Sequence, residues 1–406
     1  MSPTFHARLH YRWVIVAAAS AMLAIVMGQL VNGLSAFFSP LEVEFGWTRG
    51  DIALINTAGL IGIGLGGIVM GFAADRFNMR AVILTGVIVS GLGFVAASRA
   101  ETLWQLYTIS FLTGAFGGGA IFAPLFALVG SWFHTGAGLA IGIASAGQAI
   151  GQGGAPFANT LLIETFGWRG AFLGYGLFTL AALVPLALLL RVPAAERESG
   201  SVPAVTETGM RLPLSTVIVM MSAAVLLCCS LMAVPLMHLV PLFEGCGIPA
   251  PAAGSVVFVM MVAAIAGRVA FGKLADMIGA VPAYFVASAW QTALVFVFTK
   301  IGDLTLLYVF APIYGFGYAG VMTGVLTTIR AMTPVNKRAS TTGLILAFAW
   351  AGHGLGGYAG GLLFDLTGTY DLTFLAAAGA GAVNLVIVAA LFLLSGSALK
   401  GGVATV

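Results

Sequence analysis

The chain has 406 residues, of which 60% are hydrophobic and only 8% are charged, and its mean hydropathy is +1.05. A water-soluble domain has roughly a quarter of its residues charged, so this composition excludes a soluble enzyme or a soluble binding protein. The net charge of +3 is small and its basic residues are scattered among loops, which argues against a nucleic-acid partner. We therefore expect an all-α polytopic membrane protein.

Twelve apolar runs are long enough to cross a hydrocarbon core of about 30 Å as helices. The first six lie near residues 13–38, 50–74, 81–98, 103–130, 137–163 and 169–191. The other six lie near residues 213–240, 250–275, 280–300, 304–330, 339–364 and 372–395. The one long polar segment separates the two sets. We therefore expect an N-terminal six-helix bundle over residues 1–191, a cytoplasmic linker over residues 192–212 and a C-terminal six-helix bundle over residues 213–406.

The positions of Lys and Arg predict the orientation, because these residues accumulate in short cytoplasmic loops. If the N-terminus is inside, twelve of the seventeen are cytoplasmic: Arg8, Arg12, Arg76, Arg80, Arg191, Arg197, Arg211, Lys273, Arg330, Lys337, Arg338 and Lys400. Four fall outside: Arg49, Arg99, Arg169 and Lys300. We expect both termini to be cytoplasmic and the protein to be integral to a bacterial inner membrane.

The two halves of the chain repeat each other at a fixed offset of 201 residues. The offset pairs Pro40 with Pro241, Asp75 with Asp276, Glu164 with Asp365, Leu106-Tyr107 with Leu307-Tyr308, and Gly46, Gly66, Gly71, Gly114 and Gly167 with Gly247, Gly267, Gly272, Gly315 and Gly368. Two parallel six-helix units, related by an axis along the membrane normal, form an architecture that alternates access to a site near the membrane midplane. The sequence therefore predicts a pseudo-symmetric transporter.

The segment GFAADRFNMR, residues 71–80, resembles the loop pattern Gly-x-Leu-x-Asp-Arg/Lys-x-Gly-Arg/Lys-Arg of the major facilitator superfamily. The matching residues are Gly71, Asp75, Arg76 and Arg80, and the departures are Ala73, Asn78 and Met79. We expect Asn78 to supply the left-handed backbone that the family's Gly would give. The second copy, GKLADMIGA, keeps Gly272, Leu274, Asp276 and Gly279 but lacks the basic end.

These loop residues have two interpretations. Asp75 can face the positive N-terminal end of a neighbouring helix, while Arg76 and Arg80 hold it or bind anionic lipid. In that case Asp75, Arg76, Arg80 and Asp276 form a cytoplasmic gate. The alternative is an ordinary charged loop that obeys the positive-inside rule.

Arg268 lies well inside the eighth run, in the segment VAAIAGRVAFGKLADMIG (residues 262–279), and every Asp and Glu lies at a run end or in a loop. An Arg within a span costs on the order of 2.5 to 3.5 kcal/mol, and such residues are usually functional. We expect it to bind a carboxylate that arrives with the substrate, because the guanidinium fork suits that group. The alternative is that Arg268 caps backbone carbonyls or reaches Asp276.

Other polar groups lie within the runs. His353 follows Trp350 by one helical turn, and Tyr314 and Tyr318 are four residues apart. We expect the rings to shape the pocket, and His353 to bind substrate and carry the proton; packing is the alternative for each. The first half offers uncharged groups as substrate contacts or interhelical hydrogen bonds: Gln29, Asn32, Gln148 and Gln152. Gln152 is the repeat partner of His353.

These residues sharpen the resemblance to the monocarboxylate porter and oxalate/formate antiporter branch of the superfamily. Members carry a substrate Arg in the eighth span, which matches Arg268. The oxalate/formate exchanger has a Trp followed three residues later by Lys, where this chain has Trp350 and His353. It also has aromatic residues four apart in the tenth span, and GWTRGD and GWRGAF look like this branch. Ala264 stands where animal lactate porters have an Asp, so their proton relay is not implied.

The resemblance and the charges together predict a secondary active transporter of small organic monocarboxylates such as lactate or pyruvate, proton-coupled and working by alternating access. The alternatives are oxalate/formate-like exchange and efflux of other small molecules. The expected partners are a small carboxylate anion, a proton or counter-anion and membrane lipid, with the protein a monomer. The five histidines are scattered, which argues against an enzyme. GFGYAG, residues 315–320, follows no strand, so no nucleotide cofactor is expected. Cys228, Cys229 and Cys246 do not have the spacing of metal ligands, so no metal is expected.

Overall fold

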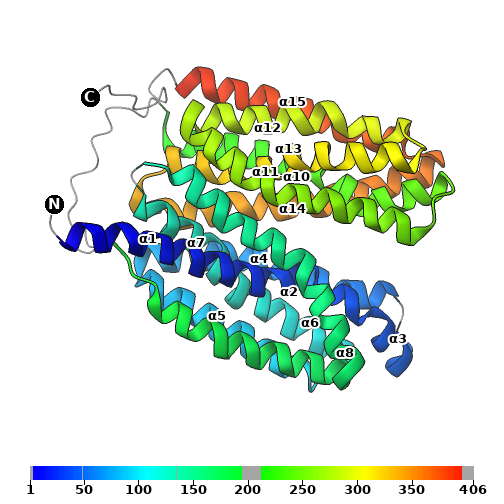
Figure 1. The fold of residues 1–406 in the computed structure, drawn as a ribbon, viewed down its shortest axis with the longest axis horizontal. Helices are drawn as coiled ribbons and strands as arrows, with labels where there is room; N and C mark the ends of the chain where they lie inside the picture. The colour runs from blue at the N-terminus through cyan, green and yellow to red at the C-terminus, as the bar shows by residue number, and fades with distance from the viewer. Residues whose placement is uncertain (1–2, 48, 134, 194–211, 396–406) are drawn as a thin grey trace. The chain divides into compact units, whose positions relative to one another are not determined.

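The computed structural model describes residues 3–47, 49–133, 135–193 and 212–395 (Figure 1). Most of the predicted linker therefore lies outside the described residues. Ten of the described helices are long and apolar enough to cross a membrane. One of them, α8 (Ala137–Leu189), contains the fifth and sixth predicted spans, which are separated at Gly167, where φ is 69° and ψ is 171°. Only glycine adopts this conformation readily, which fixes the bend there.

The first half begins with an interrupted span. It consists of α1 (Pro3–Met22), the π-helix η1 (Leu23–Met27), α2 (Gly28–Val31), the 3₁₀-helix η2 (Gly33–Phe37) and α3 (Phe38–Phe45). The next spans are α4 (Arg49–Arg76) and α5 (Met79–Ala97). The fourth span joins α6 (Leu103–Leu112), the π-helix η3 (Thr113–Gly118) and α7 (Gly119–Trp132), and α8 follows.

The second half has more regular helices. They are α10 (Leu214–Gly245), α11 (Ala250–Ile278), α12 (Ala280–Val295) with the 3₁₀-helix η4 (Phe296–Lys300), α13 (Leu304–Met332), the 3₁₀-helix η5 (Val335–Lys337), α14 (Arg338–Thr367) and α15 (Asp371–Ser395). The ends of these second-half helices match the ends of the apolar runs expected from the sequence within a few residues. The all-helical fold expected from the sequence is confirmed for the described residues.

The chain divides into two compact units. The first unit comprises residues 1–134, 143–202 and 334–347, and the second comprises residues 135–142, 203–333 and 348–406. The first turns of α14 therefore belong to the first unit, and the first turns of α8 belong to the second.

Equivalent helix pairs in the two units approach at equivalent glycines. A Cβ atom at Gly66 would lie 2.1 Å from the carbonyl oxygen of Ala115, and one at Gly267 would lie 2.0 Å from that of Phe316. These positions are related by the 201-residue offset. Because neither position has room for a side chain, glycine is required where α4 and α11 pack on the fourth and tenth spans.

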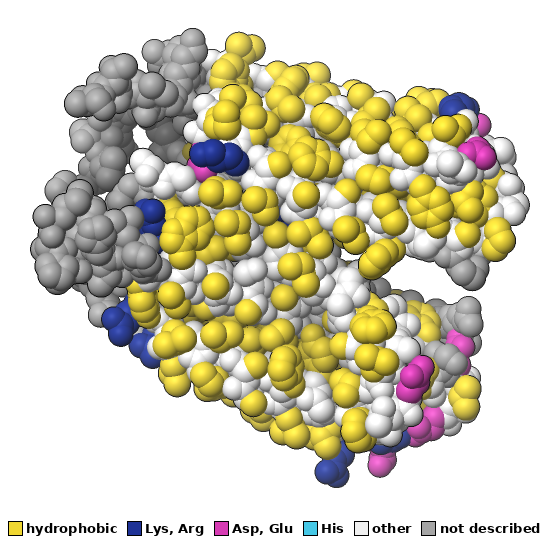
Figure 2. Space-filling view, viewed as in Figure 1, with side chains coloured by type: hydrophobic (Ala, Val, Ile, Leu, Met, Phe, Trp, Pro, Cys, Tyr) yellow, Lys and Arg dark blue, Asp and Glu magenta, His cyan; other side chains and the backbone are white. Residues whose placement is uncertain are grey.

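Large apolar side chains lie on the outside of the units. Leu65 and Val69 on α4 are 55% and 59% exposed, and Val386 and Leu393 on α15 are 68% and 76% exposed. Figure 2 shows hydrophobic side chains along the length of the visible face, whereas Lys, Arg, Asp and Glu gather near the helix ends. This distribution fits helices surrounded by lipid hydrocarbon.

Candidate functional site

Arg268 is held inside the second unit by α11. Its side chain is only 5% exposed, and it interacts electrostatically with Tyr318 on α13. The preceding residue, Gly267, brings α11 against the backbone of Phe316, and this close approach places the guanidinium on α11 near enough to the phenol on α13 for an electrostatic interaction. A buried cation beside a phenol is suited to binding an anion.

The two tyrosines of α13 differ in their surroundings. Their rings lie 5.8 Å apart, with 32° between the planes. Tyr314 is fully buried and packs edge-on against Phe298, with 5.0 Å between ring centroids, and its hydroxyl has no hydrogen-bond partner among the described residues. Tyr318 is 3% exposed and is the one that interacts with Arg268. The packing alternative therefore fits Tyr314 better than Tyr318.

His353 lies on α14, half-buried, beside Trp350. The two rings are 6.0 Å apart, and Nδ1 of His353 lies 3.1 Å from the carbonyl oxygen of Ala349. A carbonyl can only accept, so Nδ1 carries the proton. The neutral ring therefore presents Nε2 as the nitrogen able to take up a proton.

Amide side chains connect the first and fifth spans of the first unit. Asn159, which is fully buried, donates to Oε1 of Gln29 at 2.7 Å and to the carbonyl oxygen of Gly33 at 3.0 Å. Asn32 donates to the carbonyl oxygen of Gln152 at 3.1 Å. Gln29 and Asn32 thus make the interhelical hydrogen bonds that were the alternative to substrate contact.

The other two candidate amides, Gln148 and Gln152, lie earlier in α8 than Asn159. Gln148 is buried at 5% exposure and Gln152 is half-buried. Asn159 was not among the residues predicted for the site. It follows Gln148 by 11 residues, which is close to three helical turns, so Gln148, Gln152 and Asn159 share one face of the helix. This spacing is the sequence signal from which Asn159 could have been predicted as a site residue.

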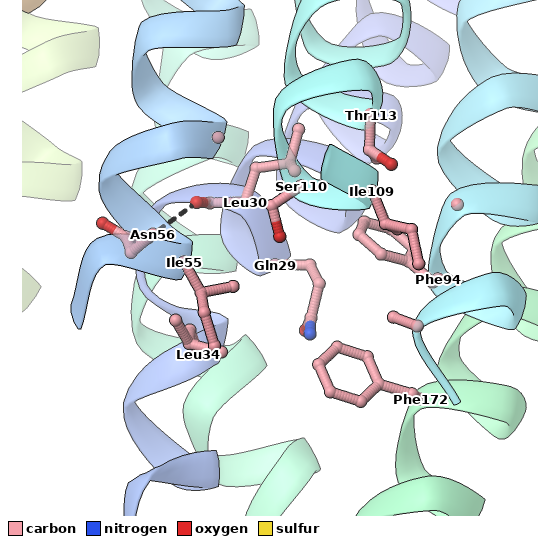
Figure 3. A pocket seen from close by; sticks show the side chains of 13 residues that line it. Gln29, Leu30, Leu34, Ile55, Asn56, Phe94, Ile109, Ser110, Thr113 and Phe172 are labelled. Carbon is pink, nitrogen blue, oxygen red and sulfur yellow. Dashed lines mark hydrogen bonds between the residues drawn. The ribbon is translucent and has the colours of Figure 1, made fainter. Parts of the chain in front are cut away.

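A cavity of about 40 Å³ lies inside the first unit (Figure 3). Its polar lining comes from Gln29, Asn56, Ser110 and Thr113. Asn56 donates to the carbonyl oxygens of Leu30 and Val31, both at 3.0 Å, and so holds α4 to the end of α2. A water molecule needs roughly 10 to 15 Å³ of such space, so the cavity has room for a few waters but not for an organic acid.

The two repeat-related aspartates bind helix N-termini. Asp75 accepts from the backbone N–H groups of Ala339 at 3.0 Å and Ser340 at 2.7 Å, in the first turn of α14. Asp276 accepts from those of Gly138 and Leu139, both at 2.8 Å, in the first turn of α8. All four N–H groups lie at helix ends that have no intrahelical acceptor, and the helix dipole favours the carboxylate there.

The basic residues of the same loop are more open. Arg76 ends α4 with an exposed side chain, and Arg80 is partly buried in the first turn of α5. The expectation of a left-handed backbone at Asn78 is wrong: its φ is −71° and its ψ is 108°. Asn78 instead caps α5, since its side chain accepts from the backbone N–H of Arg80 at 3.1 Å. An Asn is a favoured residue at this cap.

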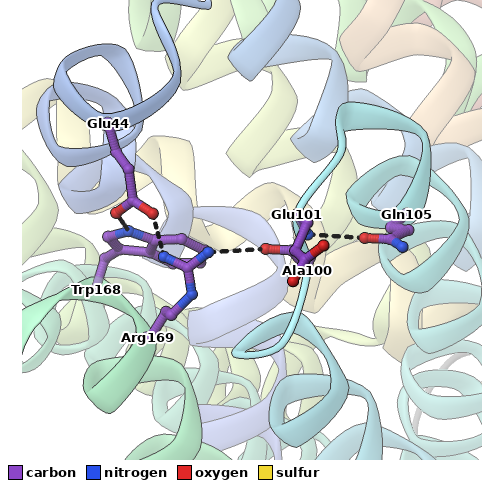
Figure 4. A network of polar contacts seen from close by, with 6 residues as sticks. All are labelled: Glu44, Ala100, Glu101, Gln105, Trp168 and Arg169. Carbon is purple, nitrogen blue, oxygen red and sulfur yellow. Dashed lines mark hydrogen bonds and ion pairs between the residues drawn. The ribbon is translucent and has the colours of Figure 1, made fainter.

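Contacts around Glu44 link α3, the bend of α8 and the loop at Ala100 at one end of the first unit (Figure 4). Its carboxylate accepts from the indole N–H of Trp168 and from the guanidinium of Arg169, and the same guanidinium donates to the carbonyl oxygen of Ala100 at 3.4 Å. The hydrogen bond from Trp168, followed by that from Arg169, lowers the pKa of Glu44. The segment GWRG, residues 167–170, therefore ties α8 to α3 at this end of the first unit.

Two helical units with repeat-related contacts, apolar outer surfaces and a buried arginine define a membrane transport protein. The family model described as Major Facilitator Superfamily matches residues 17–299 and 214–404. The chain belongs to the Major Facilitator Superfamily. Since this is a family of transporters, the protein is not an enzyme, as expected.

Curated relatives are named monocarboxylate transporters. Human monocarboxylate transporter 11 is 30% identical over 382 residues, which cover 89% of this chain and 79% of that protein. Human monocarboxylate transporter 2 is 26% identical over 420 residues, covering 96% and 86%. Monocarboxylate transporter 13 of Rattus norvegicus is 28% identical over 393 residues, covering 95% and 87%. The predicted branch of the superfamily is thereby confirmed.

Solved structures share the fold at low identity. The E. coli fucose:proton symporter FucP superimposes with a TM-score of 0.70 at 14% identity, over 94% of this chain and 98% of that one. A bacterial homologue of the iron transporter ferroportin gives 0.71 at 17% identity, over 93% and 98%. A variant of the xylose symporter XylE gives 0.76 at 13% identity, over 93% and 95%. These likenesses establish the architecture and not the substrate.

Proposed function

We propose that this protein transports small organic monocarboxylates by alternating access, coupled to protons, in a bacterial inner membrane. The observation that carries the proposal is a guanidinium, that of Arg268, buried to 5% exposure inside a membrane span beside Tyr318. The names of the curated relatives support the same substrate class.

In this mechanism Arg268 binds the carboxylate through two parallel N–H groups, and the hydroxyl of Tyr318 donates to the same anion. At about 4 Å and an effective dielectric near 20 the charge–charge contact is worth about 4 kcal/mol before desolvation. One fixed cation balances one carboxylate, which favours a monoanion. Trp350, in the same unit as Arg268 and Tyr318, borders the bound anion.

His353 takes up the coupling proton at Nε2. Its Nδ1–H is already committed to Ala349, so protonation adds a charge without breaking that hydrogen bond. Asp75 and Asp276, with Arg76 and Arg80, act as the cytoplasmic gate by binding and releasing helix N-termini. The protein works as a monomer with both termini cytoplasmic, and residues 1–191 and 213–406 form the two moving bundles.

Uptake into proteoliposomes tests the role of Arg268. Radiolabelled lactate, pyruvate, formate and oxalate are offered with and without an inward proton gradient. We expect Arg268→Gln and Arg268→Lys to lower monocarboxylate uptake at least about 100-fold, since a loss near 3 kcal/mol corresponds to two decades. Arg99→Gln is the matched control, because Arg99 is exposed. Wild-type uptake by Arg268→Gln would refute the proposal.

The variant His353→Gln tests whether His353 carries the coupling proton. We expect uptake to lose its response to the pH gradient, while exchange of labelled for unlabelled substrate continues. Gln can still donate to the Ala349 carbonyl but cannot titrate. An unchanged response to the gradient would remove His353 from the coupling step.

Exchange of oxalate-like dianions is the second candidate. It is favoured by one observation, that Nε2 of His353 is available to give a second positive charge. Oxalate counterflow that rises as pH falls, and that disappears in His353→Gln, would select it over monocarboxylate symport.

A further inference from the structure

The first, fourth and sixth spans of the first unit bring two arginines together with aromatic rings. Tyr11 and Arg12 lie on α1. Trp132 ends α7 and Phe133 follows it. Arg191 lies two residues after Leu189, where α8 ends. Contacts between these residues join α1, the end of α7 and the chain after α8, which are far apart in the sequence.

Arg191 is positioned by the rings of the other two helices. Its guanidinium carbon lies 5.0 Å from the ring centroid of Tyr11, and the indole N–H of Trp132 donates to its carbonyl oxygen at 2.7 Å. The hydroxyl of Tyr11 donates to the carbonyl oxygen of Leu189, the last residue of α8. The backbone at the end of α8 is therefore fixed, while the Arg191 side chain remains exposed.

Arg12 follows Tyr11 on α1, and its guanidinium also lies against aromatic rings. Its guanidinium carbon lies 4.9 Å from the ring centroid of Phe133 and 6.0 Å from that of Trp13. Its Nε is buried without a hydrogen-bond partner among the described residues. A ring face contributes only about 0.5 to 1 kcal/mol to a cation at an exposed site and accepts none of the strong guanidinium hydrogen bonds.

Carboxylates do not neutralise this pair among the residues that the structure describes. The ion pairs found there join Arg169 to Glu44 and Lys300 to Asp371, and both involve other loops. The cluster thus offers two positive charges next to aromatic rings, and on Arg12 a buried Nε–H without a hydrogen-bond partner among the described residues.

The surroundings indicate what kind of anion fits. Trp13 is 39% exposed and its neighbour Val14 is 41% exposed, so apolar surface continues from the cluster along α1. Tyr and Trp at span ends mark the depth of lipid headgroups, and basic residues there attract anionic lipids. A ligand with a phosphate for the arginines and hydrocarbon for Trp13 and Val14 satisfies both parts.

We propose that Arg12 and Arg191, framed by Tyr11, Trp132 and Phe133, form a binding site for the phosphate of an anionic phospholipid. The lipid bridges the ends of the first, fourth and sixth spans. This site is independent of the transported substrate and of the loop between the second and third spans.

Thermal unfolding of the purified full-length protein in detergent tests the site. Phosphatidylglycerol is compared with phosphatidylcholine at equal mole fraction. We expect phosphatidylglycerol to raise the unfolding midpoint of the wild type, and the variant Arg12→Gln with Arg191→Gln to lose at least two thirds of that shift. Arg99→Gln, which removes an exposed Arg from another loop, should keep the shift.

Two further arms identify the source of the phosphate. Inorganic phosphate at the same concentration should leave the midpoint unchanged, because it lacks acyl chains. A full shift with inorganic phosphate, or a full shift in the double Gln variant, would overturn the proposal. Should that variant fail to fold, Arg12→Lys with Arg191→Lys replaces it, since Lys keeps the charge but loses the fork. Native mass spectrometry should then show at least threefold weaker retention of phosphatidylglycerol, and unchanged retention would overturn the site.

Discussion

At equivalent positions the first unit carries Thr113 and Ala97, whereas the second carries Tyr314 and Phe298, each 201 residues later. In the second unit the two rings pack edge-on at 5.0 Å. In the first unit the two small side chains line the cavity of about 40 Å³. The same helix arrangement is therefore filled by aromatic rings in one repeat and left partly open, with polar walls, in the other.

The helices at these positions differ as well. The first unit has π-helical segments at Leu23–Met27 and Thr113–Gly118, whereas the equivalent residues 224–228 and 314–319 lie within the α-helices α10 and α13. By contrast, both units share the close glycine contacts and the aspartates at helix N-termini. The backbone contacts that assemble a bundle are thus kept in both repeats, while the interior chemistry has diverged toward amides in one and an arginine in the other.

The largest expected effect comes from making the second unit resemble the first. Tyr314→Thr removes a fully buried ring and should lower the free energy of unfolding by about 3 to 5 kcal/mol, as large-to-small substitutions in cores do. Chemical denaturation in detergent measures it. Tyr314→Phe is the control and should differ by less than about 0.5 kcal/mol, since the hydroxyl has no partner among the described residues. A neutral Tyr314→Thr would show that the ring does not fill the core.

Next in size are Asp75→Asn and Asp276→Asn. Each removes a charge that accepts two backbone N–H groups, so we expect a loss of about 1 to 2 kcal/mol from either. Hydrogen exchange gives the local readout: Asp75→Asn should speed exchange at Ala339 and Ser340, and Asp276→Asn at Gly138 and Leu139. Each variant is the control for the other. If one variant sped exchange at the starts of both α14 and α8, the idea that each aspartate stabilises only its own helix end would be contradicted.

A substitution at Gly59, which lines the cavity of the first unit, is expected to raise the free energy of unfolding by a smaller amount. A Cβ at Gly59 would lie 3.6 Å from the carbonyl oxygen of Ser110, an ordinary contact, so Gly59→Ala should stabilise by about 0.4 to 1 kcal/mol. Gly62→Ala on the same helix is the matched control and should destabilise, because its Cβ would lie 2.3 Å from the carbonyl oxygen of Phe111. The unfolding midpoint distinguishes them. Two variants of equal sign would contradict the geometry.

The smallest effect concerns the exposed loop cluster at Glu44. Since its pKa in the folded protein is lowered from the ordinary 4.5, its stabilisation is present above that value and is lost as pH falls through the folded pKa. We expect the difference in unfolding midpoint between wild type and Glu44→Gln to be small at pH 7 and to vanish on acidification. A difference independent of pH would show that charge plays no part.

Hydropathy and the internal offset predict most of this fold, because spanning length and the positions of Gly and Asp are local properties of the sequence. They do not predict the π-helices, which depend on packing against neighbouring helices. The cap at Asn78 is a local contact that the residue type favours, although the superfamily pattern points to a different backbone there. The break at Gly167 is predicted only as a gap between two apolar runs.

The site is partly accessible from the sequence. Arg268 and its neighbour Tyr318 can be found because a cation within an apolar run is rare. Tyr314, four residues away on the same helix, looks identical in sequence but is sealed against Phe298. Asn159 escapes notice because its importance lies in meeting Gln29, a contact 130 residues apart. Side-chain partners across helices are a tertiary property that spacing alone does not reveal.

The hydrogen bonds of Asp75 have a consequence for biosynthesis. Ala339 and Ser340, which bind its carboxylate, lie 264 and 265 residues later in the chain. At ribosomal speeds of about 5 to 20 residues per second, this aspartate waits roughly 13 to 50 s for the amides that complete it. During that interval the carboxylate at the end of α4 lacks these two partners, so the first unit closes there only after residues 203–333 of the second unit have been made.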